Sequence, residues 1–165
     1  ITEFPLPADL SIPNDITAGP GGNLWFTELG GNKIGRISLS GNITEFSIPT
    51  YESKPYYITA GPGGNLWFTE LDGNKIGRIT PDGRITEFPL PADLSEPNDI
   101  TAGPDGNLWF TDLANKIGRI TSDGRITEFP IPTPKNSPDG ITVGPDGNLW
   151  FTEVANKIGR ITLNR

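Results

Sequence analysis

The sequence predicts an all-β protein, a β-propeller made of four blades with four antiparallel strands in each. Its first basis is an internal repeat: Ile-Thr-Glu-Phe begins at residues 1, 43, 85 and 126, which gives repeats 1–42, 43–84, 85–125 and 126–165. The second is the frequency of glycine (21 residues) and proline (17 residues), which interrupt every stretch before a long helix can develop. Repeats of this length that hold four short strands are typical of propeller blades. The whole chain, 1–165, is therefore expected to form one domain.

The strands of one blade can be placed on the first repeat. The innermost strand is expected at 15–18, the second at 23–28, the third at 33–37 and the outer strand at 43–46. Gly-Gly and Asp-Gly pairs between these segments supply the positive φ angles of tight turns. Proline follows the Ile-Thr-Glu-Phe strand in most repeats, and proline is tolerated at the edge of a sheet, so this strand is placed outermost.

Two further repeated residue types receive structural interpretations. The tryptophan of each repeat is expected to pack between neighbouring blades, with ligand stacking as the alternative. The arginine of each Lys-Ile-Gly-Arg segment is expected to pair with the repeated glutamate of the outer strand. The tryptophans are Trp25, Trp67, Trp109 and Trp150, the arginines are Arg36, Arg78, Arg119 and Arg160, and the glutamates are Glu3, Glu45, Glu87 and Glu128.

Composition excludes several classes of function. A net charge of −7 argues against nucleic acid and anionic membranes as partners. No apolar run is long enough to span a bilayer, so a soluble protein is expected, although no feature predicts its compartment. The chain has no cysteine and no histidine, which excludes thiolate chemistry and any mechanism that needs an imidazole.

Acidic and aromatic residues are predicted to gather at one mouth of the propeller channel. One set begins the loops between second and third strands and is a candidate Mg²⁺ or Ca²⁺ site, the alternative being a solvated acidic rim. The other set directly precedes the inner strands and is a candidate ligand-binding surface. No cofactor is required by either interpretation. The candidate metal ligands are Glu28, Glu70, Asp112 and Glu153, and the candidate ligand-binding residues are Asp15, Tyr56, Tyr57, Asp99 and Asp139.

The repeated blocks GPDGNLWFTE, NKIGRIT and ITEFPLP resemble the blade repeat of the virginiamycin B lyase (streptogramin lyase) family. The resemblance covers all four repeats and implies a propeller that has seven blades in the family. It also implies an elimination that opens a cyclic depsipeptide ester, with a histidine base and a magnesium ion held by acidic groups. This chain has no histidine, and only its acidic residues offer counterparts. The sequence therefore favours a non-catalytic scaffold, natural or designed, over a lyase-like enzyme, and it leaves a binding module open.

The two ends of the chain predict self-association. Ile1–Leu6 is an outer strand without a blade of its own, whereas the last blade ends after its third strand, Lys157–Leu163. Two chains that exchange their N-terminal strands would close one eight-bladed ring as a homodimer with no free sheet edge. A four-bladed ring within one chain is the alternative.

Overall fold

The computed structural model describes residues 1–163, so 164–165, the last two residues of the fourth repeat, lie outside the described residues. Blade 1 contains β1 (Pro13–Ala18), β2 (Leu24–Glu28), β3 (Lys33–Ile37) and β4 (Ile43–Ser47). Blade 2 contains β5 (Pro55–Ala60), β6 (Leu66–Glu70), β7 (Lys75–Ile79) and β8 (Ile85–Pro89). Blade 3 contains β9 (Pro97–Ala102), β10 (Leu108–Asp112), β11 (Lys116–Ile120) and β12 (Ile126–Pro130), and blade 4 contains β13 (Pro138–Val143), β14 (Leu149–Glu153) and β15 (Lys157–Ile161).

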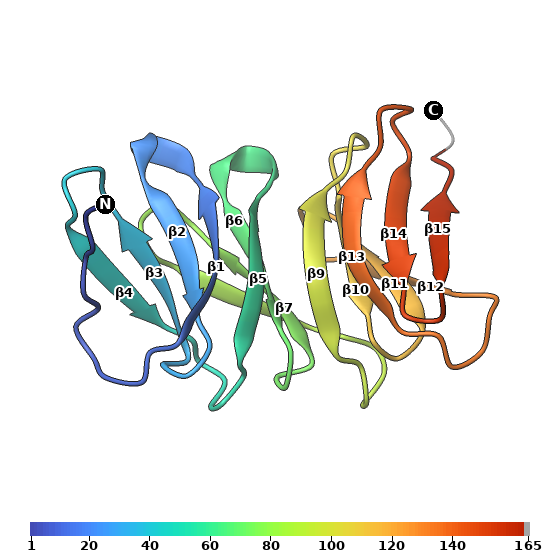
Figure 1. The fold of residues 1–165 in the computed structure, drawn as a ribbon, viewed down its shortest axis with the longest axis horizontal. Coiled ribbons are helices and arrows are strands. Elements are labelled where there is room, and N and C mark those ends of the chain that lie inside the picture. Colours follow the sequence, from blue (N-terminus) through green and yellow to red (C-terminus); the bar gives the residue numbers. More distant parts are fainter. Residues whose placement is uncertain (164–165) are drawn as a thin grey trace.

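The blades stand side by side, each as one antiparallel sheet in chain order (Figure 1). Their first strands contact one another in succession, β1 with β5, β5 with β9 and β9 with β13. The N-terminus lies beside blade 1 and the end of the described chain lies beside blade 4, at opposite ends of the row (Figure 1). The all-β propeller architecture predicted from the repeat is confirmed.

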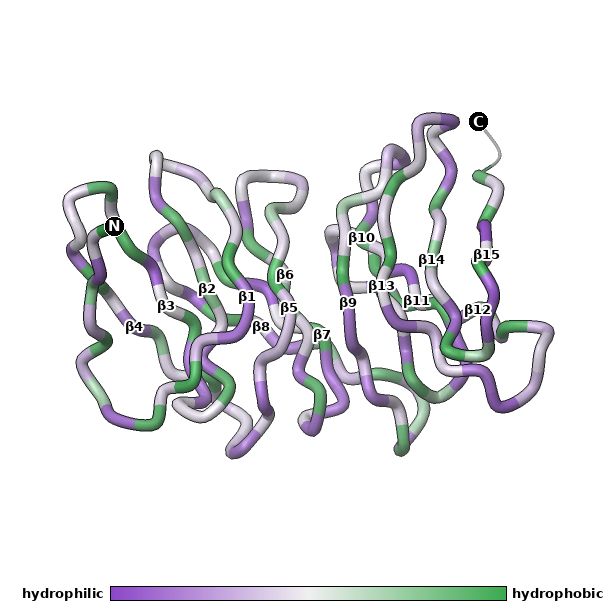
Figure 2. The backbone as a smooth tube through the Cα atoms, viewed as in Figure 1, coloured by the Kyte–Doolittle hydropathy of each residue, from purple (hydrophilic) through white to green (hydrophobic). Residues whose placement is uncertain are grey.

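Single-turn 3-10 segments at Pro20–Gly22 and Pro62–Gly64 connect the first and second strands of blades 1 and 2. No helix within residues 1–163 is both long and apolar enough to cross a membrane. Hydrophobic and hydrophilic residues alternate along many of the strands, as expected where side chains point to opposite faces of a sheet (Figure 2).

The hydrophobic core lies between the blades rather than within any one of them. At the first interface Trp25, Ile34 and Ile48 from the blade 1 side pack against blade 2. Equivalent clusters fill the interfaces between blades 2 and 3 and between blades 3 and 4. Each blade therefore presents the tryptophan of its second strand to the next blade, on what we call its tryptophan-bearing face. It presents the phenylalanine of its second strand, Phe68 in blade 2, to the previous blade, on its phenylalanine-bearing face. The residues on the blade 2 side of the first interface are Ile58, Leu66, Phe68 and Ile79.

The glycine of the Lys-Ile-Gly-Arg strand has a packing reason. A Cβ atom on Gly35 would lie 2.1 Å from the Phe26 ring, and the same close approach recurs at Gly77 below Phe68. Any larger residue would displace the ring from the interface core. This explains why the third strand of every blade carries glycine at its centre.

The predicted strands agree closely with those of the structure, and the third strand at 33–37 has the predicted bounds. The first strand begins two residues earlier than expected, at Pro13. Ile1–Leu6, expected as an outer strand, does not form a strand in the structure. It lies beside blade 1, at the opposite end of the row from β15 (Figure 1).

Candidate functional site

The four blades form an open arc, and we call the edge along which the first strands β1, β5, β9 and β13 contact one another its inner edge. Side chains from neighbouring first strands meet there. Asp15 of β1 accepts a hydrogen bond on Oδ2 from the Ile58 backbone N–H of the next blade, at 2.8 Å. Asp99 of β9 repeats this contact with the Ile141 N–H, also at 2.8 Å. These two carboxylates therefore connect adjacent blades, and they occupy the positions at which a ligand-binding role was predicted.

The other predicted ligand-binding residues lie on the same edge. The rings of Tyr56 and Tyr57 meet at 82° with their centroids 4.9 Å apart. Asp139 accepts a hydrogen bond at 2.8 Å from the Asn98 amide. Burial raises the pKa of Asp99, and the charges of Asp15 and Asp139 raise it further. The structure thus gathers the predicted residues, but their carboxylates are largely engaged by the protein itself.

The four candidate metal ligands do not share one environment, because Glu153 of blade 4 is half-buried whereas the other three are not accessible. Glu28, Glu70 and Asp112 are completely buried, one in each of three blades. Within residues 1–163 no three acidic, histidine or cysteine side chains come together in a way that could hold a metal ion. The ammonium of Lys75 also lies close enough to lower the pKa of Glu70. These residues therefore do not fit the magnesium ion that the family resemblance implies, and the predicted acidic rim is wrong for these three carboxylates.

Glu70 is the most strongly perturbed of these carboxyl groups. Burial raises its pKa to about 8, and the charge of nearby Glu87 adds to the effect. Neither of its oxygens has a hydrogen-bond partner among the described residues. A carboxyl group in this environment holds its proton at neutral pH and acts as an uncharged side chain.

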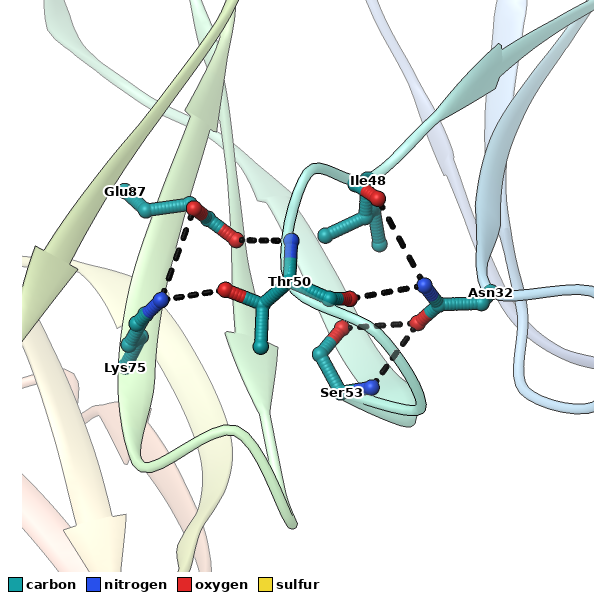
Figure 3. A network of polar contacts seen from close by, with 6 residues as sticks. All are labelled: Asn32, Ile48, Thr50, Ser53, Lys75 and Glu87. Carbon is teal, nitrogen blue, oxygen red and sulfur yellow. Dashed lines mark hydrogen bonds and ion pairs between the residues drawn. The ribbon is translucent and has the colours of Figure 1, made fainter.

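A polar network connects blade 1, the chain that leaves it, and blade 2 (Figure 3). The Asn32 amide donates to the Thr50 carbonyl at 2.8 Å, and its oxygen accepts from the Ser53 hydroxyl, also at 2.8 Å. On the other side Glu87 accepts from the Thr50 N–H at 3.0 Å, and Lys75 binds both Glu87 and Thr50. The network fixes the connection between β4 and β5 against the second blade.

Lysine rather than arginine pairs with the outer-strand glutamate, which corrects the sequence-based pairing. The Nζ to Oε2 distances are 2.5 Å for Lys33–Glu45, 3.5 Å for Lys75–Glu87 and 2.9 Å for Lys116–Glu128. The lysine and the glutamate lie on the same face of adjacent strands, because Gly35 opposes Glu45 and Lys33 is two residues away.

The arginine instead stacks on aromatic rings. The Arg36 guanidinium lies 5.5 Å from the ring centroids of both Trp25 and Phe46, which are themselves stacked. Its Nη1 also donates at 3.0 Å to the Pro81 carbonyl of the next blade. Blades 2 and 3 repeat this cluster of Trp, Arg and Phe. The cluster therefore belongs to the interface between blades, where cation–π contacts add to apolar burial.

The two ends of the arc expose the halves of one such interface. On blade 1 Ile16 is 58% exposed, whereas its counterpart Ile58 is 4% exposed. On blade 4 Ile158 is 65% exposed, whereas its counterpart Ile76 is fully buried. Arg160 lies 5.4 Å from the Trp150 ring, with no phenylalanine beside this pair in the described part of the chain. Parts of both end faces are thus open, at Ile16 on blade 1 and at Ile158 on blade 4, although Phe26 of blade 1 is buried.

The N-terminal segment lies on the open face of blade 1. Phe4 and Leu6 line an apolar hollow of about 290 Å³ there, together with Ile16 and Phe26. Residues that follow them bind the hairpin between β2 and β3: the Leu29 N–H donates to the Ile12 carbonyl and the Gly30 N–H to the Ser11 carbonyl, each at 3.0 Å. The connection between blades 1 and 2 docks on blade 2 through the same contacts, from Leu71 and Asp72 to residues 53 and 54.

Comparison with known proteins places this geometry in a family. The model of the virginiamycin B lyase family matches residues 1–165. The structure of virginiamycin B lyase from Staphylococcus aureus is similar with a TM-score of 0.95 and 53% identity, over 98% of this chain and 56% of that one. A structure of a catalytically inactive variant of that lyase with quinupristin, in which one histidine is replaced by alanine, has a TM-score of 0.96 and 53% identity, over 99% and 56%.

A third similar structure is that of a computationally designed protein, Ika4, with a TM-score of 0.74. Its 9% identity, over 98% of this chain and 97% of that one, supports the shared fold alone. The chain spans little more than half the length of the lyase from Staphylococcus aureus. Because the family model matches every residue, the chain belongs to the virginiamycin B lyase family.

Proposed function

We propose that the 165-residue chain is a non-catalytic propeller scaffold whose open ends are closed by a second copy, giving an eight-bladed ring. The observation that carries the proposal is the match between its two ends. Blade 4 offers Trp150 and Arg160 without a phenylalanine beside them in the described part of the chain. Blade 1 offers Phe4, already in place on its outer face, without a tryptophan in the hollow it lines. Each copy holds the half of the interface that the other needs.

The absence of histidine supports a non-catalytic role. The lyase variant described as catalytically inactive differs by replacement of one histidine, and this chain has none. Glu70 has a pKa of about 8, in the range that suits a general base. It is completely buried, however, so that a substrate does not reach it. Incubation of the chain with quinupristin and Mg²⁺ is expected to give no ring opening, and turnover above the buffer control would favour the alternative of a lyase-like enzyme.

The angle between blades supports eight rather than four. A seven-bladed ring needs about 51° per blade and an eight-bladed ring about 45°, whereas four blades need about 90°. Close-packed interfaces accept a change of a few degrees far more readily than one of about 40°. Two four-blade arcs therefore close with nearly unchanged interfaces.

A matched pair of variants tests the self-association. Phe4→Ala removes the ring from the proposed contact between copies, and Phe88→Ala removes the equivalent ring from an interface within one chain. Sedimentation velocity should show that Phe4→Ala shifts the population to single chains. Phe88→Ala should lower the thermal stability but keep the assembled species. Equal effects of the two variants on assembly would contradict the proposal.

A further inference from the structure

The outer edge of β15 carries no fourth strand in the described part of the chain, whereas β3, β7 and β11 each pair with one. Blades 1, 2 and 3, in which a fourth strand covers this edge, are called the closed blades and show what such an edge binds. We propose that the β15 edge is a recognition site for an extended peptide of the type Thr-Glu-Phe-Pro, and that residues Ile1–Leu6 of a second copy are its occupant. This inference rests on the proposed function and names the contacts that select the occupant.

The register of the complex follows from the three closed blades. In blade 2 Ile76 opposes Phe88, Gly77 opposes Glu87 and Arg78 opposes Thr86. Blades 1 and 3 have the same pairs. Transferred to blade 4, this register places Phe4 of the second copy opposite Ile158, and Glu3 of that copy opposite Gly159. Backbone hydrogen bonds would provide affinity, and the side chains on alternate positions would provide specificity.

Lys157 is the residue that selects glutamate. Its counterparts Lys33, Lys75 and Lys116 each bind the glutamate of the neighbouring outer strand. Lys157 is exposed, and its ammonium donates at 2.7 Å to the Thr133 hydroxyl instead of a carboxylate. An incoming Glu3 would complete the fourth ion pair of the series, beside the half-buried Glu153.

Trp150 and Arg160 select the phenylalanine. In the closed blades the arginine lies 5.4–5.9 Å from the phenylalanine ring, and that ring stacks on the tryptophan. In blade 4 Arg160 lies 5.4 Å from the Trp150 ring and 3.8 Å from the Asp146 carboxylate. The Trp150 indole N–H donates to Asp146 at 2.9 Å, as Trp109 donates to Asp105 in blade 3, so this contact is compatible with a stacked phenylalanine. Phe4 of the second copy would cover both groups and bury the exposed Ile158.

Asn156 is expected to bind the segment of the second copy that follows Pro7. Its counterpart Asn32 binds Thr50 and Ser53 on the connection to the next blade (Figure 3). The equivalent positions for Asn156 are Ala8 and Ser11 of the second copy. In the single chain the Ser11 hydroxyl donates to the Ala8 carbonyl at 3.0 Å, so the two groups bind each other and would exchange this bond for two contacts with Asn156.

The occupant comes from another molecule because the chain's own segment is elsewhere. Ile1–Leu6 lies beside blade 1, at the opposite end of the row from β15 (Figure 1). Phe4 is already packed against Gly41 there. A second copy presents the same segment on its own blade 1, next to the apolar face that the tryptophan-bearing face of blade 4 fits. One docking event therefore pairs the strand and buries both faces.

The test uses the 165-residue chain with Phe4→Ala, whose own N-terminal segment lacks its anchor but whose β15 edge is intact. The probe is a fluorescent synthetic peptide, Ile-Thr-Glu-Phe-Pro-Leu-Pro, followed by anisotropy, with a scrambled peptide as the control. Saturable binding of the native peptide alone is expected. Adding Lys157→Glu should weaken binding at least tenfold, and a peptide with lysine in place of glutamate should restore it. Circular dichroism checks that each variant is folded.

The outcomes separate this inference from the proposed function. Peptide binding by a wild-type chain that sediments as a single chain would support the β15 site and contradict the ring of two copies. Assembly of the wild-type chain without selective peptide binding would overturn the β15 site and leave the ring in place. Equal binding of the native and scrambled peptides, or no effect of Lys157→Glu, would also overturn the inference.

Discussion

The ring of Phe4 packs against Gly41 as the ring of Phe46 packs against Gly83. A Cβ atom on Gly41 would lie 2.3 Å from Cε1 of Phe4, and one on Gly83 would lie 2.1 Å from Cε1 of Phe46. Both glycines have left-handed backbone angles, with φ of +90° and +92°. Blade 1 therefore presents to the N-terminal segment the same surface that blade 2 presents to β4. The unpaired segment is held in the position of an outer strand before any partner strand is added.

Replacement of either glycine by alanine tests the role of this contact. Both changes strain the turn, at a cost of about 1–2 kcal/mol for a left-handed residue with a side chain. Only Gly41→Ala also displaces the segment proposed to join two copies. Concentration-dependent sedimentation should therefore show weaker assembly for Gly41→Ala than for Gly83→Ala. Equal assembly by the two variants would mean that the docked position of Phe4 has no part in it.

Trp67→Ala is expected to lower the free energy of unfolding by about 3–5 kcal/mol, as is typical when a buried aromatic side chain is deleted. Trp67 is completely buried between blades 2 and 3. Urea unfolding followed by circular dichroism measures the change, with the wild-type chain studied at the same concentration. A loss below about 1 kcal/mol would show that the tryptophans are not the core of the interfaces.

The stability of the chain should depend on pH through Glu70. Its pKa is raised from 4.5 to about 8 in the folded chain. The stability that comes from holding this proton is therefore fully present below pH 4.5 and is lost as pH rises through about 8. Glu70→Gln is an uncharged replacement and should make unfolding less dependent on pH between these values. Urea midpoints at pH 5, 7 and 9 test this for both chains. Parallel losses in the wild type and the variant at pH 9 would assign the dependence to another group.

The neighbouring Glu87 acts in the opposite direction. Burial alone would raise the pKa of Glu87, but the Thr50 contacts and the Lys75 charge together hold it below the usual value. The stability that the ionised Glu87 adds to the folded chain is present above pH 4.5 and is lost as pH falls below that value. The Glu87→Gln variant should therefore differ most from wild type above pH 4.5, with the two stability curves converging in acid. Unfolding midpoints of the two chains at pH 3 and pH 6 test the difference.

Calcium or magnesium is expected to leave the chain unchanged. The candidate ligands Glu28, Glu70 and Asp112 are buried in separate blades, and hard cations need several oxygen ligands around one point. Isothermal titration with either cation should give only the heat of dilution. A saturable heat at one ion per chain would show that acidic groups converge in solution.

Much of the fold could be predicted because the same pattern of strand and turn residues occurs in all four repeats. The alternation of short strands and glycine turns, and the single tryptophan in each repeat, led to the blades and to their buried interfaces. The environments of the charged residues could not be predicted in this way. Whether Lys33 or Arg36 meets Glu45 depends on which face of the strand each side chain occupies and on the glycine opposite the glutamate. The sequence does not state that register.

The candidate metal ligands illustrate the same limit. Glu28 and its counterparts were placed on a rim because they begin loops, and loops are usually at the surface. The chain that arrives from the previous outer strand covers them, as the contact of the Gly31 N–H with the Ser11 carbonyl shows for blade 1. Burial of this kind comes from a connection that is distant in sequence. The proposed ring of two copies differs from these cases, because the motifs at the two ends of the chain already predict an exchange of strands. The exposed Ile16 and Ile158 at the two end blades support that proposal.

The molar mass of the wild-type chain in solution tests the central claim most directly. Multi-angle light scattering across a tenfold range of concentration should give about 36 kDa, twice the 17.8 kDa of one chain. A stable, folded species of 17.8 kDa at every concentration would contradict the ring of two copies.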